Sequence, residues 1–410
     1  MTYAFLIDSV QFSKATVAGE TSLGGSESAC VGLARALAAR GHDVHIYATR
    51  LDADAAGPDA GGVTWHPANE FRQTNSWIEW DVVVALRQCA WFGEPVMARL
   101  RLLWNQDLLM PGVGSSIMSV AWQIDRLVYV SDYHQRQWED EQPELKGIGW
   151  ATKNGFDASL VPTDAVKYPN RIIHISRPER GLEPILAMWP ALKAQRPDAE
   201  LHICRYQSMY DSEGSNVKAA CEHFDREVAR VNQAVGGITW LGSLGKRDLY
   251  RAIAESAVMW YPGIDSFAET SCIAAIEAQA NGTPFVGSWK GALPETVPSG
   301  VLVPGDAMTP AYQERSVAAV LAALDGCASQ GFAYRKQQIA GRAHVKGYTY
   351  DAIAAEWDAQ VDAWFAQRYE AHKPAILEQL LQEDDHCAAK LVAREMLQAH
   401  QTTSLTVADD

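Results

Sequence analysis

The chain has 410 residues, of which 48% are hydrophobic and 21% charged, as expected of a globular protein large enough for two domains. Its net charge of −15 disfavours nucleic acid and anionic membrane surfaces as partners, because both carry negative charge themselves. The seven cysteines are scattered and never spaced as CxxC, which favours reduced thiols, a cytoplasmic location and no zinc site.

Two further properties of the chain limit its class. No stretch approaches the roughly 20 apolar residues of a transmembrane helix, and Asp8 interrupts the first apolar run, so no signal peptide is expected. The acidic charge is unevenly spread: residues 1–165 hold 12 Lys and Arg against 20 Asp and Glu, residues 166–345 hold 18 of each, and residues 346–410 hold 5 against 12. A site for an anionic ligand is therefore expected in the neutral middle of the chain.

Residues 1–165 alternate between strand and helix patterns, which predicts a Rossmann-like α/β domain with a parallel sheet. A buried strand at 3–8 precedes a helix over 24–42, which Gly41 is expected to end. Further strands are predicted at 43–49, 63–67, 81–86, 101–105 and 126–131. The 15 residues from Ser9 to Leu23 are predicted to form a loop, a candidate lid or acceptor-binding segment.

The same alternation restarts after a linker at about 160–170, so residues 166–345 are expected to form a second Rossmann-like domain. Its strands are predicted at 171–177, 199–205, 238–243, 257–262, 283–288 and 300–304. Two doubly wound sheets in tandem place a ligand cleft between their facing carboxyl ends.

The last part of the chain predicts helices alone. A long helix is expected over 346–372, crossing back to the body, and a helical hairpin over 373–410 that turns near 383–385. We expect these helices to pack on the body or to join subunits into a homo-oligomer.

The first glycine-rich stretch is LGGSESA, residues 23–29. Gly24 and Gly25 open a helix, where backbone N–H groups and the positive helix end can meet an anion. The stretch is not GxGxxG and no acidic residue ends the second strand, which disfavours a nicotinamide dinucleotide. A plain tight turn is the alternative interpretation.

A second stretch, SRPERG at 176–181, lies between a predicted strand and a predicted helix. Arg177 and Arg180 can converge on a diphosphate, because guanidinium groups bind phosphate oxygens in pairs. The alternative is a surface ion pair with Glu179 or Glu183.

A third stretch, SFAETSCIAAIEAQANGTP at 266–284, carries two carboxylates eight positions apart. Glu269 is predicted at the mouth of a helix and Glu277 about 12 Å further along it, at ~1.5 Å per residue. Apolar neighbours such as Ile276 indicate that Glu277 is buried and needs hydrogen-bond donors. The two acids can hold opposite ends of one ligand, or they can be two solvated side chains.

Together with VSDYH (130–134), NGFD (154–157) and GSLGKRDLYRAIAESAVMWYP (242–262), these stretches resemble the retaining glycosyltransferases of family 4. The resemblance covers about residues 1–365 and implies the GT-B fold, in which two Rossmann-like domains face a central cleft.

The resemblance also implies roles for individual residues. Glu277 would bind the ribose of a nucleotide-diphosphate sugar, UDP- or GDP-linked, and Glu269 would contact the transferred sugar. Arg177 and Arg180 would neutralise the diphosphate without a metal or other cofactor. The remaining donor-binding positions would be the glycines Gly24 and Gly25, the amides of Thr270, Ser271, Cys272 and Ile273, and Gly242 and Ser243 beside the base.

Two features depart from the family pattern. The two basic residues stand closer together than usual, and Gln106 occupies the place where many members have histidine. Gln106 can bond a sugar hydroxyl but cannot titrate.

The sequence thus predicts a retaining, metal-independent hexosyltransferase that moves a sugar from a nucleotide-diphosphate donor to a hydroxyl acceptor. The alternatives are a sugar-nucleotide epimerase, a phosphorylase-like GT-B enzyme, and a non-catalytic nucleotide-sugar binder or scaffold.

Overall fold

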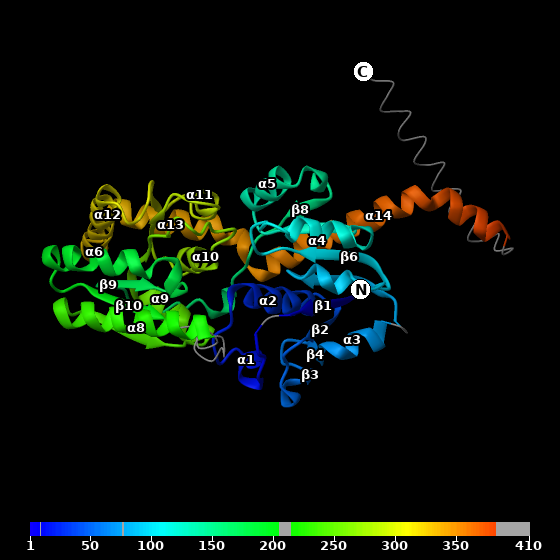
Figure 1. Ribbon diagram of the computed structural model, residues 1–410, viewed down its shortest axis with the longest axis horizontal. Coiled ribbons are helices and arrows are strands. Elements are labelled where there is room, and N and C mark those ends of the chain that lie inside the picture. The colour runs from blue at the N-terminus through cyan, green and yellow to red at the C-terminus, as the bar shows by residue number, and fades with distance from the viewer. Residues whose placement is uncertain (9, 76–77, 205–214, 383–410) are drawn as a thin grey trace, which may run out of the picture. The chain divides into compact units, whose positions relative to one another are not determined.

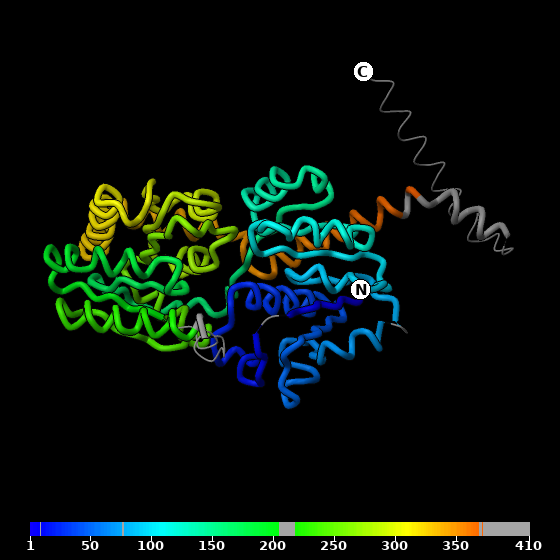
Figure 2. Tube along the Cα trace, in the orientation of Figure 1, coloured from blue at the N-terminus to red at the C-terminus, as the bar shows by residue number. Residues whose placement is uncertain are grey.

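The computed structural model describes residues 1–8, 10–75, 78–204 and 215–382. The chain divides into two compact units, Met1–Ala354 and Ala355–Asp410. The first unit contains two sheets that the chain forms one after the other (Figure 1 and Figure 2). The last strand of the first sheet ends at residue 151 and the first strand of the second begins at 168. The division into domains 1–165 and 166–345 stays a prediction.

The first sheet has the strand order β3-β4-β2-β1-β5-β6-β7-β8, and its neighbours are parallel except β3 and β4. Its strands are β1 (Thr2–Ile7), β2 (Asp43–Ala48), β3 (Gly57–Pro58), β4 (Val63–Pro67), β5 (Trp80–Leu86), β6 (Ala98–Trp104), β7 (Arg126–Tyr129) and β8 (Gly149–Ala151). The α-helices between them are α1 (Lys14–Ala18), α2 (Gly25–Ala39), α3 (Ala68–Asn75), α4 (Val113–Val120) and α5 (Asp132–Glu141).

The second sheet is parallel throughout, in the order β11-β10-β9-β12-β13-β14, which is the doubly wound order of Rossmann folds. Its strands are β9 (Tyr168–His174), β10 (Glu200–Cys204), β11 (Ile238–Gly242), β12 (Ser256–Tyr261), β13 (Phe285–Ser288) and β14 (Val301–Val303). Its α-helices are α6 (Leu182–Gln195), α8 (Ser215–Val235), α9 (Lys246–Glu255), α10 (Ile273–Ala280), α11 (Leu293–Thr296), α12 (Pro310–Ala328) and α13 (Phe332–His344). The predicted α/β class and strands are confirmed.

Both faces of the second sheet are covered, which explains why its strands are apolar without alternation. Successive side chains of a strand point to opposite faces. Ile172 of β9 therefore packs in a core with α6, α8 and α12, whereas Ile173 packs in another with α9 and α10. This arrangement leaves the carboxyl ends of the strands as the place for a ligand site.

The segment 9–23 differs from the loop that the sequence predicts, because it contains helix α1. Ser13 caps α1 by accepting from the Thr16 amide at 3.2 Å, and Thr16 in turn accepts from the Ser13 amide. This is a capping box in which threonine stands where glutamate is usual, so the sequence pattern gave little sign of it. Gly19, with φ of 78°, ends the helix.

The last residues of the first unit contact the part of the chain that contains the first sheet. Tyr350 donates from its amide to Phe156 O and from its hydroxyl to Ser28 O at 3.0 Å. Helix α14 (Tyr350–Gln382) continues past residue 372, the predicted end of the long helix. The predicted hairpin turn near 383–385 lies outside the described residues.

Among the described residues, no single helix has both the length and the apolarity needed to cross a membrane. The bent pair Pro310–Ala328 and Phe332–Tyr348 passes that test jointly, by length and composition. Helix α12, the first of the two, packs with its apolar side into the core of the second sheet.

Lys167 provides a test of this fold, because its partly buried amino group bonds to two other segments of the chain. Its Nζ donates to Ala254 O and Ser256 O, each at 2.9 Å, and to Thr283 Oγ1 at 2.8 Å. We expect Lys167→Met to lower the free energy of unfolding by about 2 kcal/mol, since the acceptors stay buried without their donor. Urea denaturation measures this, with exposed Lys218→Met as the control; equal stability of the two variants would contradict the assignment.

Candidate active site

Helix α10 begins later than the sequence predicts. Its first residue is Ile273 and Cys272 is its N-cap, so Glu269 precedes the helix, and the predicted spacing of about 12 Å along one helix is wrong. The reason is a long-range bond: Glu269 O accepts from the Ala292 amide at 2.7 Å instead of from the next helical turn. Glu277 lies inside α10, as predicted.

The Glu269 carboxylate is buried, with 8% of the residue exposed, in contrast to the solvated alternative. Tyr261 donates its hydroxyl to Oε1 at 2.5 Å, and a guanidinium nitrogen of Arg180 lies 3.8 Å from the same oxygen. Burial raises the pKa of Glu269, while the Arg180 charge and the Tyr261 hydrogen bond act in the opposite direction. Burial also raises the pKa of Tyr261, which keeps its hydroxyl protonated as the donor.

The two predicted arginines have different surroundings. The Arg180 guanidinium stacks over the Phe267 ring at 4.1 Å and is thereby fixed beside Glu269. Arg177 is about half exposed and forms an ion pair with Glu179 at 2.5 Å, which is the alternative that the sequence left open. Arg180 is therefore part of the buried cluster, whereas Arg177 would have to exchange Glu179 for a phosphate.

The N-termini of two helices meet at this site. Gly24 is the N-cap of α2, and the first residue of that helix, Gly25, faces Ile273 at the start of α10. A Cβ on Gly25 would lie 3.3 Å from Ile273 Cδ1, so a larger side chain would crowd this approach. Free N–H groups and positive dipole ends from both helices favour an anion here.

Glu277 lies at an open cavity beside these helix ends, whose empty space of about 530 Å³ includes part of the adjoining solvent. The residue is 2% exposed, and its Oε1 accepts from Lys246 Nζ at 2.5 Å, which provides the donor that its burial requires. The cavity is lined from the first sheet's half by Ser22, Leu23 and Gly25 and from the second by Ile175, Cys204, Leu244, Lys246, Leu249, Ile273, Ala274 and Glu277.

Gln106 is buried and engaged by Asn154. The two side-chain amides exchange hydrogen bonds of 3.1 Å, and Asn154 Nδ2 also donates to Ser271 O at 3.2 Å. Thr270 Oγ1 donates to Gln106 O at 2.8 Å. Gln106, Thr270 and Ser271 are thus brought together, and Gln106 has only part of its amide left for a sugar hydroxyl.

Two further contacts join the two halves of the first unit near the site. Gly242 ends β11 with φ of 76°, and the next residue, Ser243, shares a hydrogen bond of 2.6 Å with Ser22. The Glu295 carboxylate of α11 accepts from the Tyr133 amide, in the first turn of α5, at 3.1 and 3.3 Å. The predicted base-side residues Gly242 and Ser243 therefore lie where the segment after α1 meets the second sheet's half.

Two buried histidines, His134 and His174, lie outside the cluster of Glu269, Tyr261 and Arg180. His134 and His174 are buried, and burial lowers the pKa of each to about 4, so both are neutral at pH 7 and serve packing and backbone hydrogen bonds. The described residues contain no group of three or more His, Cys, Asp or Glu side chains arranged for a metal ion.

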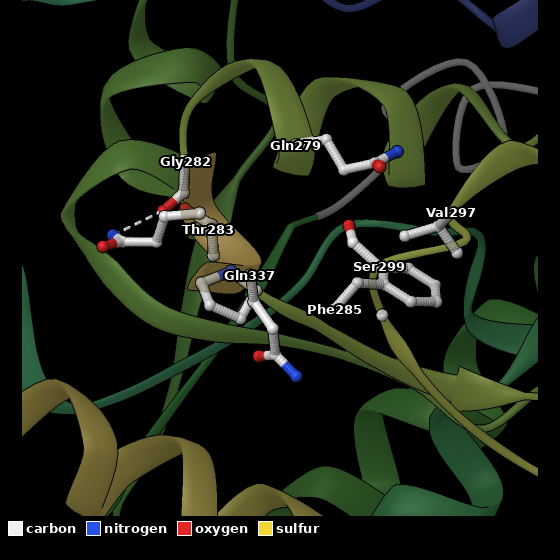
Figure 3. A pocket seen from close by; sticks show the side chains of 10 residues that line it. Gln279, Gly282, Thr283, Phe285, Val297, Ser299 and Gln337 are labelled. Atoms are coloured by element: carbon white, nitrogen blue, oxygen red, sulfur yellow. Dashed lines mark hydrogen bonds between the residues drawn. The ribbon is translucent and has the colours of Figure 1, made fainter. Parts of the chain in front are cut away.

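Figure 3 shows a second hollow, lined by residues of the α10 end, β13 and α13, among them Gln279, Ser299 and Gln337. It is smaller, at about 210 Å³, and Gln338 closes one side by donating to Gly282 O at 2.9 Å. Gln279 there already donates to Ala275 O and Thr296 O. None of the predicted site residues lines this hollow.

The two sheets and the cleft residues between them define the architecture as GT-B, the fold of a large class of glycosyltransferases. The chain is similar over 90% of its length to all of sucrose-phosphate synthase from Thermosynechococcus elongatus, with a TM-score of 0.65 and 17% identity. It is similar over 88% of its length to all of Anabaena HepE, solved in complex with UDP and glucose, with a TM-score of 0.66 and 14% identity.

Sequence comparison gives a more specific match for the second half. Residues 169–324 match the family described as glycosyl transferases group 1. Over 226 residues the chain is 25% identical to the GDP-mannose-dependent monoacylated alpha-(1-6)-phosphatidylinositol monomannoside mannosyltransferase of Corynebacterium glutamicum. That alignment covers 48% of this chain and 53% of the relative, so the chain spans about half the length of the curated relative it matches.

Sequence reasoning missed three partners in the site: Tyr261, Lys246 and Asn154. Lys246 follows a glycine turn and opens α9, and Tyr261 ends β12, positions that point toward a carboxyl-end site in a parallel sheet. Their pairing with Glu277 and Glu269 is a tertiary contact, which the sequence pattern does not encode.

Gly291 supplies a test of how Glu269 is held. It has φ of 57°, and a Cβ there would collide with the backbone N and O of Glu269. We expect Gly291→Ala to destabilise the protein by about 2 kcal/mol, because the positive φ and the collision add. Thermal unfolding measures this, with Gly347→Ala, where a Cβ meets nothing within 4 Å, as control. Equal melting temperatures would contradict the packing described.

Proposed function

We propose that this chain is a glycosyltransferase that moves a hexosyl group from a UDP- or GDP-linked donor to a hydroxyl acceptor, with retention and without a metal ion. The observation that carries the proposal is the Glu269, Tyr261 and Arg180 cluster beside the converging starts of α2 and α10. The match of residues 169–324 to glycosyl transferases group 1, the mannosyltransferase relative and the GT-B fold support it.

In this proposal the chain catalyses the transfer by electrostatic stabilisation of the leaving diphosphate and by positioning the donor. The helix ends and Arg180 stabilise the negative charge that grows on the diphosphate as the sugar bond breaks. Glu269 accepts hydrogen bonds from hydroxyls of the transferred sugar, and Glu277 accepts those of the ribose. Arg177 adds its charge once it leaves Glu179. The acceptor hydroxyl gives its proton to the departing phosphate on the same face, so no carboxylate nucleophile is required, unlike in a retaining glycosidase.

A donor panel tests the proposal directly. Thermal shift with UDP-, GDP-, ADP- and dTDP-linked sugars identifies a donor, since a ligand that binds only the folded state raises the melting temperature. Donor turnover is then measured with water and with sugar acceptors, in EDTA to remove metal ions. Tight donor binding without turnover on any acceptor would leave a binding protein instead of an enzyme.

Substitution of Glu269 separates catalysis from binding. We expect Glu269→Gln to lower kcat about 100-fold while the free nucleotide diphosphate binds as before, because Glu269 contacts the sugar and not the nucleotide. Glu183→Gln, an exposed glutamate on α6, is the control and keeps full activity. Unchanged kcat in the Glu269 variant would remove this residue from the mechanism.

The pH profile gives an independent test. The pKa of Glu269 is raised by burial, and the Tyr261 hydrogen bond holds it lower than burial alone would. Tyr261→Phe removes that bond, so the pKa of Glu269 rises further. The acid limb of the kcat/KM profile then moves to higher pH, while kcat/KM at pH values above that limb changes little. Tyr334→Phe, which loses a hydrogen bond to Ala257 O, is the matched control. An acid limb that stays in place or moves to lower pH would contradict the role of Tyr261.

A further inference from the structure

Two histidines lie side by side on neighbouring strands of the first sheet. His45 belongs to β2 and His66 to β4, and His45 Nδ1 lies 2.9 Å from His66 Nε2. The outer nitrogen of each ring faces a carboxylate. His45 Nε2 lies 3.1 Å from Asp43 Oδ1 of β2, and His66 Nδ1 lies 3.4 Å from Glu70 Oε2 of α3. The four ionisable side chains form one continuous row across β2, β4 and α3.

Aromatic rings hold both imidazoles in this orientation. The ring of Tyr47 stacks on His66 at 4.7 Å with an interplanar angle of 16°, and the edge of Trp80 meets His45 at 5.3 Å. The side chains of His45 and His66 remain 20% and 24% exposed. Protons can therefore exchange between this row and solvent without movement of the rings.

The row is complete only with a particular number of hydrogens. A carboxylate only accepts, so each outer nitrogen favours an N–H, and the inner contact needs one N–H between its two nitrogens. Two neutral imidazoles supply two hydrogens for these three contacts. One added proton supplies the third, whereas two added protons make two N–H groups face each other across the inner contact. One proton thus completes the row and a second disrupts it.

The contact lengths indicate which hydrogen the neutral pair lacks, because the contact between His66 and Glu70 is the longest of the three. Burial lowers the pKa of His66 from its usual value of 6.5, as does the charge of His45, whereas Glu70 acts in the opposite direction. The pair is therefore neutral above this pH, and its first proton is expected on His66 Nδ1 as the solution becomes acidic.

The other titratable groups of the surrounding elements do not replace this proton. Burial raises the pKa of Tyr47 on β2, so its phenol stays neutral. His42, before β2, contacts the Met1 amino group at 3.3 Å instead. Arg72 on α3 pairs with Glu94. On β5, Trp80 carries no titratable group, and the next residue, Asp81, bonds to Thr2 and Arg99.

We propose that this row is a pH-sensitive tie between α3 and the first sheet, which closes when His66 Nδ1 takes up one proton and donates it to Glu70. The inference is independent of the proposed function. Because the pKa of His66 is lower in the folded than in the unfolded chain, the free energy of unfolding falls as pH decreases through about 6.5. The bond to Glu70 limits that loss and keeps α3 on the sheet.

The first test follows both rings in the full chain by NMR of labelled histidine nitrogens, with His45→Gln and His66→Gln to assign the signals. We expect two separate titration steps, with His66 first, because the second proton is repelled by the first. Glu70→Gln should lower the pKa of His66 by about half a unit, since it removes the negative acceptor. Glu79→Gln, an exposed glutamate outside the row, should leave it unchanged. Titration of both rings in one step, or no decrease with Glu70→Gln, would overturn the inference.

The second test measures the tie itself by hydrogen exchange of the backbone amides of α3. The ratio of exchange rates between Glu70→Gln and the unaltered protein should be about threefold larger near pH 5.5 than near pH 8, because only the protonated His66 donates to Glu70. Comparison of the two ratios removes the effect of Glu70 on the helix dipole, which is the same at both pH values. An equal ratio at both pH values would mean that Glu70 supports α3 without the proton, and the inference would be wrong. Thermal unfolding near pH 8 confirms that each variant is folded.

Discussion

A buried carboxylate must be met by hydrogen-bond donors, and this requirement organises the whole site. Glu269 and Glu277 are buried on either side of the start of α10, and each has its own donors: Tyr261 with Arg180 for one, Lys246 for the other. Tyr261 ends β12, Arg180 lies in the turn that follows β9, and Lys246 opens the helix that follows β11. The strand order of the second sheet thus determines which side chains can reach the two acids.

The sequence predicted the strands well, because sheets buried on both faces require apolar runs bounded by polar turns. It also predicted the burial of Glu277, whose neighbours are apolar. It placed Glu269 at the mouth of the helix but began the helix too early, since the Glu269 carbonyl bonds to the Ala292 amide, beyond any local pattern. Helix α1 was missed because its capping box uses Thr16. The pairings of Lys246 and Asn154 depend on how distant segments meet.

The similar structures share 14% and 17% of their residues with this chain, yet they have the same fold. Fold persists at such identities because it depends on apolar patterns that many sequences satisfy. The chemistry depends on a few polar side chains, and those have to be examined in this chain. Gln106, whose amide is held by Asn154, is one such side chain.

The short turn after β13 serves two functions at once. Gly291 packs against the backbone of Glu269, and four residues later Glu295 caps helix α5 across the cleft. Separation of the two halves would break this cap, whose carboxylate belongs to the same turn that supports Glu269. The turn therefore couples the contact between the two halves to the backbone that positions Glu269.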